Sequence, residues 1–326
     1  MKFSVITPVY NREDCVSRCI ESVLRQTLLK DNGGGKIELV VVDDGSSDLT
    51  AKICAGYAIN NSIIKFIQLP HNVGTNAARN TAISAAIGDY IVILDSDDYL
   101  VDDALKFMES TIEGNSGYTH YMFAPNDVNY DIPFFNNCKR KVLAYQDFLC
   151  GKVKTGFIHC IARSTMLKYP FDEHVRIHEG VFFLSFYKEA QKMLFTNRIV
   201  TIRERGRSDS VTLDCVRSNK TLIERATNAN EIMLERFGND FKEYKCVDVL
   251  KHIYGYLYDN YLLLSQYDKI LKLDALYDTQ FKDCKLHSKK VTVLHIIRAM
   301  RLGETYRQLL QSYLFVKYKF FKFKIK

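Results

Sequence analysis

Short apolar runs rich in β-branched residues alternate with helical patterns over the first part of the chain, and this alternation constrains the fold more than any other feature. The runs predict buried strands at Phe3–Thr7, Ile37–Val42, Ile63–Gln68 and Tyr90–Leu94. Helical spacing lies between them, at Glu13–Gln26, Asp48–Tyr57 and Thr75–Ala86. Because consecutive parallel strands need a crossover connection, usually a helix, the pattern predicts an α/β fold with a mainly parallel central sheet covered on both faces.

The pattern changes in the second part of the chain. Two more strands are predicted at Tyr118–Pro125 and Thr155–Ala162, separated by a polar loop at Asn126–Asn137. After about Cys215, helical patterns follow at Thr221–Phe237, Val247–Leu264 and Val291–Leu310. With 326 residues the chain is long enough for a large domain and an appendage. We therefore expect one domain over residues 1–215 and a helical C-terminal region over residues 216–326.

The composition is typical of a globular protein, with 47% hydrophobic and 25% charged residues. No window offers the roughly 18 uncharged apolar residues that a membrane-spanning helix needs. The start, MKFSVITPVYNRED, has no apolar signal region, and the nine cysteines form no CxxC pair or regular framework. We therefore expect a cytoplasmic protein with free thiols.

Polar clusters follow the four predicted strands of the first part, at the sheet edge where open α/β folds bind ligands. The first cluster is Thr7-Pro8-Val9-Tyr10-Asn11, in which Tyr10 suits stacking on a base; an ordinary proline turn is the alternative. The second, Asp43-Asp44-Gly45-Ser46-Ser47-Asp48, offers carboxylates for a base N–H or a ribose hydroxyl. Helix capping explains one of these acids but not all of them.

The third cluster, Asn72–Asn80 (NVGTNAARN), leads into a predicted helix. Its small residues let a phosphate approach the helix N-terminus, where N–H groups and the dipole favour an anion. Arg79, one turn into the helix, suits a phosphate or a base.

The fourth cluster is Leu94-Asp95-Ser96-Asp97-Asp98-Tyr99. Three ionised carboxylates so close together repel one another, and a hard divalent cation such as Mg²⁺ or Mn²⁺ relieves that repulsion. A solvated acidic turn is the alternative.

In this order and spacing, PVYN, DDGSSD, NVGTNAARN and LDSDD resemble the family 2 glycosyltransferases, whose nucleotide-sugar-binding fold is called GT-A. The resemblance implies inverting transfer of a hexosyl or N-acetylhexosaminyl group from a nucleotide diphosphate sugar, usually a UDP-sugar, with Mn²⁺ or Mg²⁺. It also implies a saccharide or lipid-linked acceptor in bacterial surface-polysaccharide synthesis. Carried onto this chain, it assigns nucleotide binding to Thr7, Pro8, Tyr10, Asp43, Asp44 and Arg79, the DxD pair to Asp95 and Asp97, and the metal to Asp97 and Asp98.

Members of this family often carry a Glu-Asp pair that opens a helix and supplies the general base for the acceptor hydroxyl. In this chain Glu179 matches the first acid of that pair, but Gly180 stands in place of the second. The resemblance therefore implies Glu179 as the base, with His178, Asp172 and Glu173 as alternatives. Capping of the following helix is a purely structural role for Glu179.

Further along, Ile202–Val211 resembles the family's arginine- and serine-containing loop over the donor diphosphate, with Arg205 and Arg207 as candidate diphosphate ligands. A solvated strand face is equally compatible with these arginines.

From Gln311 to the end the chain has five lysines, four phenylalanines, two tyrosines and no acid. Such a segment favours peripheral contact with an anionic membrane, here the inner face of the cell membrane. A surface strand or frayed tail is the alternative, and no recognisable nucleic-acid module accompanies the charge.

Two other functions stay open from the sequence. A nucleotidyltransferase also uses an α/β sheet with acidic metal ligands, although its usual Gly-rich loop after the first strand is missing here. A nucleotide-sugar-binding relative that lost its catalytic base is suggested by Gly180.

Overall fold

The computed structural model describes residues 1–31, 35–136, 138–153, 156–173, 175, 179–204, 220–281, 305–306 and 308–309. The chain forms two compact units. The first comprises residues 1–148 and 152–207, and the second residues 149–151 and 208–326. The predicted boundary at residue 215 falls outside the described residues and stays a prediction.

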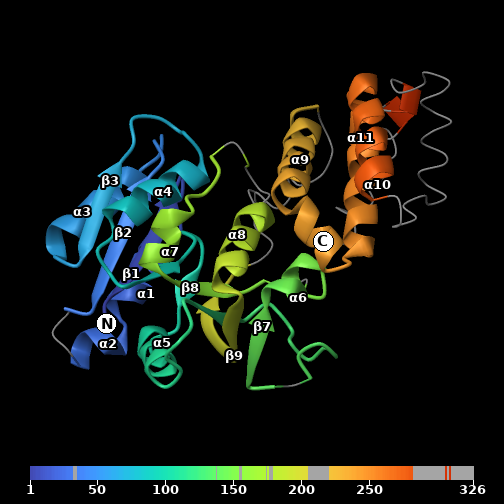
Figure 1. The fold of residues 1–326 in the computed structure, drawn as a ribbon. Helices are drawn as coiled ribbons and strands as arrows, with labels where there is room; N and C mark the ends of the chain where they lie inside the picture. The colour runs from blue at the N-terminus through green and yellow to red at the C-terminus, as the bar shows by residue number, and fades with distance from the viewer. Residues whose placement is uncertain are drawn as a thin grey trace. The chain divides into compact units, whose positions relative to one another are not determined.

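The first unit is built on one mixed sheet (Figure 1). Its strands are β1 (Phe3–Val9), β2 (Ile37–Asp43), β3 (Ile64–Gln68), β4 (Tyr90–Ile93), β5 (Tyr99–Leu100), β6 (His120–Pro125), β7 (Arg140–Ala144), β8 (Ile158–Ala162) and β9 (Lys192–Ile202). They lie in the order β3-β2-β1-β4-β8-β6-β9-β5, and β7 also pairs with β9. The β3-β2-β1-β4 half is parallel, as predicted, whereas β8 pairs antiparallel with both β4 and β6.

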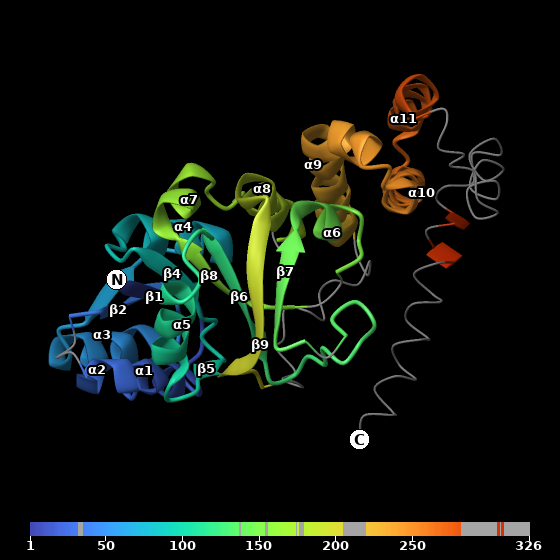
Figure 2. The ribbon, with the colours of Figure 1, turned by 60° about the horizontal axis from the view of Figure 1, so that its bottom comes forward.

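Helices cover both faces of the sheet (Figure 2). They are α1 (Val16–Leu24), α2 (Thr27–Asp31), α3 (Thr50–Asn60), α4 (Thr75–Ala85), α5 (Ala104–Glu113), α6 (Tyr145–Leu149), α7 (Arg163–Lys168) and α8 (Gly180–Ala190). One apolar core joins the sheet to α1, α3 and α5, through residues such as Ile20, Cys54 and Met108. The other joins it to α4, α7 and α8, through Ala82, Met166 and Phe186.

The predicted strands and helices of the first part are confirmed, but other elements were not expected. The longest is β9, whose apolar pattern is interrupted by the polar run Thr196-Asn197-Arg198. The predicted loop at Asn126–Asn137 holds no regular element among its described residues. It is nevertheless packed, because Tyr130 and Phe135 are buried in it.

The second unit is helical in its described part, with α9 (Lys220–Glu243), α10 (Val247–Leu263) and α11 (Tyr267–Gln280). Cys150 and Cys246 form a disulfide within this unit, so the expectation of free thiols throughout is wrong for these two residues. Among the described residues, no helix is both long and apolar enough to cross a membrane. The predicted tail Gln311–Lys326, and most of the predicted helix Val291–Leu310, lie outside the described residues.

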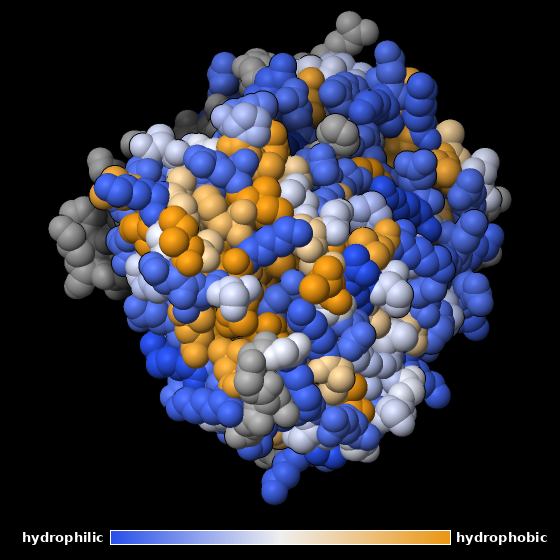
Figure 3. All heavy atoms as spheres, turned by 90° about the vertical axis from the view of Figure 1, so that its left-hand side faces the viewer, coloured by the Kyte–Doolittle hydropathy of each residue, from blue (hydrophilic) through white to orange (hydrophobic). Residues whose placement is uncertain are grey.

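Apolar side chains gather among polar ones on the face of the first unit shown in Figure 3. Ile59 on α3 and Leu49 just before that helix are 84% and 58% exposed. Exposed apolar side chains are common on folded proteins, so no role follows from their exposure alone.

The turn after β2 packs tightly against the turn after β3 at Gly45. This glycine has a φ of +70°, and an added Cβ would lie 2.5 Å from the carbonyl carbon of His71. The contact brings two of the polar clusters at the sheet edge together.

Replacing this glycine tests the contact. Gly45→Ala should lower the free energy of unfolding by at least about 2 kcal/mol, because it adds left-handed strain to a backbone clash. Gly56→Ala on α3, where an added Cβ meets nothing within 4 Å, is the control and should not destabilise. Urea unfolding measures both, and equal stabilities of the two variants would contradict the contact.

Candidate active site

A buried arginine joins two of the predicted site residues. Arg79 on α4 is 6% exposed, and its Nη2 donates to Asp95 Oδ1 at 3.0 Å. Its Nη1 donates to Glu179 Oε1, across a sequence separation of 100 residues. Burial by itself would lower the pKa of Arg79, but the carboxylates of Glu179 and Asp95 outweigh it and raise that pKa. The guanidinium is therefore a permanent cation between two carboxylates.

The same face of α4 holds the segment that leads to Glu179. Asn76 Nδ2 donates to the carbonyl oxygens of Asp172 and Val175, both at 2.9 Å. One turn later, Asn80 exchanges hydrogen bonds with the Phe171 backbone, accepting from its N–H at 2.8 Å and donating to its oxygen at 2.9 Å. The asparagines of the NVGTNAARN motif thus position Phe171, Asp172 and Val175, a role that the sequence alone did not reveal.

A carboxylate of the chain itself binds the backbone just before α4. Asp44, 4% exposed, accepts from the N–H groups of Val73 at 2.7 Å and Gly74 at 2.9 Å. These two N–H groups precede the first residue of α4, so a phosphate at the N–H groups of the first helical turn stays a prediction. Asp43 is fully buried and accepts from Ser46. Both acids brace the loops of the sheet edge, and ligand contacts by them stay a prediction.

The residues at the end of β1 divide into buried and exposed ones. Thr7 and Pro8 are buried in the strand. Tyr10 is 41% exposed, so its ring is accessible for stacking on a base.

The acidic turn after β4 presents its carboxylates differently. The Asp95 side chain is 49% exposed and Asp97 is half-buried, whereas Asp98 is 8% exposed. Arg203 lies beside Asp98, with Nε 3.6 Å from Oδ2. Arg18 Nη2 donates to the Asp97 carbonyl at 3.2 Å, which fixes the backbone of the turn.

A cation at this turn would need further ligands from the substrate to complete its coordination. In the part of the chain that the structure describes, no cluster of three or more His, Cys, Asp or Glu side chains could hold a metal ion alone. Mg²⁺ in nucleotide enzymes is commonly bound by one or two carboxylates together with substrate phosphates. That Asp97 and Asp98 supply these carboxylates stays a prediction, and Asp98 already has Arg203 beside it.

Glu179 immediately precedes α8, and its side chain is 36% exposed. An added Cβ at Gly180 would meet nothing within 4 Å, so the place of the second acid of the family pair is open space. The fallback residue His178 and the candidates Arg205 and Arg207 lie outside the described residues.

Two histidines behind the site were missed in the sequence. His120 on β6 and His159 on β8 share a hydrogen bond of 3.0 Å between Nε2 and Nδ1. Burial lowers the pKa of both; Arg203 and Arg79 lower that of His159 further, to about 3. The histidines are 39 residues apart, and only the pairing of β6 with β8 brings them together.

Comparison with known proteins assigns the family. A model of glycosyl transferase family 2 matches residues 4–160. The chain is 30% identical to an uncharacterized glycosyltransferase of Haemophilus influenzae over 60% of its own length and 76% of the relative. The chain belongs to glycosyltransferase family 2.

A second relative is matched over nearly its whole length. The GalNAc(5)-diNAcBac-PP-undecaprenol beta-1,3-glucosyltransferase of Campylobacter jejuni is 26% identical over 87% of this chain and 89% of the relative. Several other curated glycosyltransferases are matched over 15% to 35% of their length.

Solved structures confirm the GT-A fold of this family 2 glycosyltransferase. TarS residues 1–349 from S. aureus in complex with UDP-GlcNAc align with a TM-score of 0.62 at 20% identity, covering 96% of this chain and 91% of that chain. The mannosyltransferase PcManGT from Pyrobaculum calidifontis, in complex with GDP-Man and Mn²⁺, aligns at 0.56 and 17% identity, covering 96% and 85%. At these identities the likeness concerns the fold.

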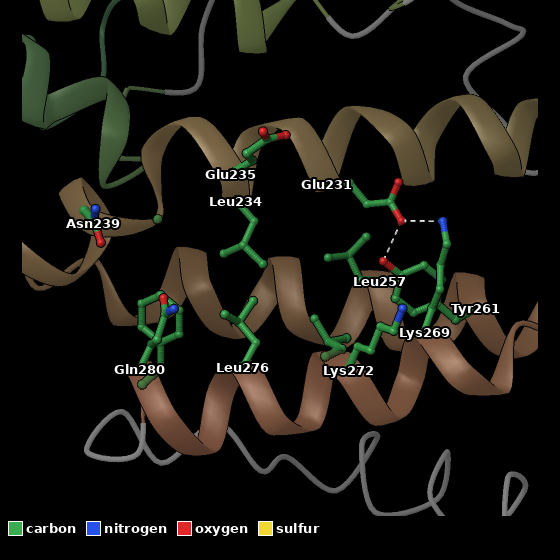
Figure 4. A pocket seen from close by; sticks show the side chains of 13 residues that line it. Glu231, Leu234, Glu235, Asn239, Leu257, Tyr261, Lys269, Lys272, Leu276 and Gln280 are labelled. Atoms are coloured by element: carbon green, nitrogen blue, oxygen red, sulfur yellow. Dashed lines mark hydrogen bonds and ion pairs between the residues drawn. The ribbon is translucent and has the colours of Figure 1, made fainter.

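A pocket of about 540 Å³ in the second unit has a different chemistry (Figure 4). Leucines of α9, α10 and α11 line its interior, and Glu231 at the rim accepts from Tyr261 at 2.7 Å and Lys269 at 2.8 Å. Its charged rim is thus already paired in part, and the pocket lacks the carboxylate turn found at the sheet edge.

The Arg79 bridge can be tested by its effect on stability. Arg79→Met should lower the free energy of unfolding by about 1–3 kcal/mol, since it leaves two carboxylates without their shared cation while both keep access to water. Lys168→Met, which removes the exposed pair with Glu189, should leave stability unchanged. Arg79→Met with wild-type stability in urea would contradict the bridge.

The histidine pair predicts a pH dependence. Below about pH 6.5 the free energy of unfolding should fall, because the unfolded chain takes up protons that folded His120 and His159 refuse. The slope reaches about 1.4 kcal/mol per pH unit for each of them. His120→Gln should flatten the slope, and His71→Gln, at an exposed histidine, should not. Identical slopes for both variants in urea titrations between pH 7 and 5 would refute the pair.

Proposed function

We propose that this family 2 glycosyltransferase moves a sugar from a UDP-sugar to a hydroxyl of a saccharide or lipid-linked saccharide, with inversion and with a divalent metal. The observation that carries the proposal is the Arg79 bridge. It holds Asp95, in the acidic turn where a diphosphate would bind, next to Glu179, the carboxylate proposed to activate the acceptor.

The donor site would use the carboxyl edge of the parallel half of the sheet. Tyr10 offers an exposed ring for the base, and Asp97 and Asp98 would hold Mn²⁺ or Mg²⁺ on the diphosphate. The metal, when bound, neutralises charge on the leaving diphosphate. The UDP-GlcNAc complex of TarS and the Mn²⁺ complex of PcManGT support this chemistry on the same fold.

The chain's own residues would carry the acceptor step. The Glu179 carboxylate takes the proton of the acceptor hydroxyl, whose oxygen then bonds to the anomeric carbon as the bond to the diphosphate oxygen breaks. Arg79 keeps the Glu179 carboxylate oriented through the bond to Oε1. The orientation of the base and the placement of the donor lower the barrier chiefly by proximity.

A lipid-linked acceptor is supported by the C. jejuni relative, whose name gives an undecaprenol-linked acceptor. We propose peripheral contact with the inner face of the cell membrane through the lysine- and aromatic-rich segment Gln311–Lys326. The family assignment does not support the nucleotidyltransferase alternative. The open space at Gly180 favours one second candidate, a nucleotide-sugar-binding relative with impaired transfer.

The metal assignment predicts the behaviour of Asp97→Ala. Mn²⁺-dependent binding of UDP should weaken at least about tenfold, because the cation loses a carboxylate ligand. Asp131→Ala, at an exposed acid in the 126–137 segment, is the control and should bind like wild type. Calorimetry with and without Mn²⁺ measures both variants, and unaltered UDP binding by Asp97→Ala would refute the metal site.

Substitutions at 179 and 180 separate the two candidate functions. If Glu179 is the base, Glu179→Gln should bind the donor and lose transfer at least about 100-fold, while Gly180→Asp changes transfer little. If transfer is impaired in this chain, Gly180→Asp should raise it, since the new carboxylate enters open space. Transfer of radiolabelled sugar to a saccharide acceptor decides between the two candidate functions. Full activity of the Glu179→Gln variant would exclude Glu179 as the base.

A further inference from the structure

His159 lies near the start of β8, between the two parts of the proposed site, the turn at Asp95 and Glu179. On β8, Cys160 pairs with Val92 of β4, so His159 is beside Ile93, two residues before Asp95. Its ring stacks on Phe183 of α8, with centroids 4.2 Å apart. Phe183 lies one helical turn after Glu179, and the Phe183 N–H donates to the Glu179 carbonyl oxygen at 2.9 Å. His159 is thus close in the fold to both bridged carboxylates.

His120 lies behind His159, away from the site. On β6, Met122 pairs with His159, so His120 is two residues further from the site on the same face of the sheet. Its ring packs on Tyr187 at 5.5 Å, one turn further along α8 than Phe183. This bond runs away from the site and takes His159 Nδ1, so Nε2 is the ring nitrogen left for a ligand.

The unpartnered atom of the pair decides where the protons are. His120 Nδ1 is buried and has no hydrogen-bond partner in the part of the chain that the structure describes. A buried N–H without an acceptor is costlier than a bare ring nitrogen, so the proton of His120 belongs on Nε2, where it is donated to His159. His159 Nδ1 is then the acceptor, and its own proton is on Nε2.

The surroundings of His159 keep it a neutral donor. Burial opposes a positive charge on its ring most, and Arg203 and Arg79 oppose it further. The residue is partly exposed, and its Nε2 has no hydrogen-bond partner among the described residues. A neutral, fixed N–H of this kind matches an uncharged oxygen. A phosphate is better matched by arginine side chains and by a metal at the Asp95–Asp98 turn.

We propose that His159 Nε2–H donates a hydrogen bond to a hydroxyl or amide oxygen of the donor sugar, and that His120 positions it by fixing the tautomer. The inference rests on the proposed function, because it needs a sugar between the diphosphate and Glu179. It assigns to His159 a part in recognising the sugar rather than the nucleotide.

Two polar substitutions of His159 in the full chain test this role. The amide nitrogen of Gln reaches the position of Nε2, whereas that of Asn reaches only the position of Nδ1. Calorimetry in Mn²⁺ gives the affinities for UDP, UDP-glucose and UDP-GlcNAc, and the informative quantity is each UDP-sugar's affinity divided by that of UDP. His159→Asn should lower this ratio about 5- to 10-fold for the preferred sugar, and His159→Gln should keep it within about twofold. Neither variant should change the affinity for UDP.

Several outcomes would overturn the inference while leaving the donor site intact. The first is a wild-type protein that binds UDP-glucose and UDP-GlcNAc no more tightly than UDP. The second is the same ratio of UDP-sugar affinity to UDP affinity in the Asn and Gln variants. The third is an equal loss of UDP binding in both variants, which would mean a merely structural role for His159. Failure of the wild-type protein to bind UDP would instead overturn the proposed function, and the inference with it.

Discussion

The ion-paired bridge of Arg79 is the interaction on which the account of the site depends. One buried guanidinium spans the carboxylates of Asp95 and Glu179, which come from distant parts of the chain. Arginine suits this task because its planar fork serves two acceptors at once, which a lysine ammonium on a flexible stem does less well. The bridge joins two acidic motifs, which in the proposed function are the donor end and the acceptor end of one site.

Structural bonds around the bridge explain why so many polar residues gather at this edge. Asp44 satisfies N–H groups before α4, while Asn76 and Asn80 hold the segment before α8. These side chains mainly position the loops. Among the described site residues, Tyr10 and the carboxylates of Asp95 and Glu179 are exposed to solvent, and Asp97 is half-buried. The roles proposed for them are base stacking by Tyr10, metal-assisted diphosphate binding at the acidic turn and proton transfer by Glu179.

The sequence was informative where local pattern determines structure. Buried runs such as Ile37–Val42 predict parallel strands, because only a sheet covered on both faces tolerates continuous apolar segments. It was less informative where distant elements meet. The pairing of β6 with β8, which creates the His120–His159 pair, and the contact of Arg79 with Glu179 are determined by tertiary packing. The polar run Thr196-Asn197-Arg198 likewise concealed β9, whose backbone is held by strands on both sides.

The most direct test of the account is a crystal structure of the protein with Mn²⁺ and UDP-GlcNAc. It should show the diphosphate and the cation against the turn at Asp95–Asp98, with the Arg79 contacts to Asp95 and Glu179 retained and the sugar lying toward Glu179. A nucleotide bound elsewhere, or a bound nucleotide with no cation at that turn, would contradict it.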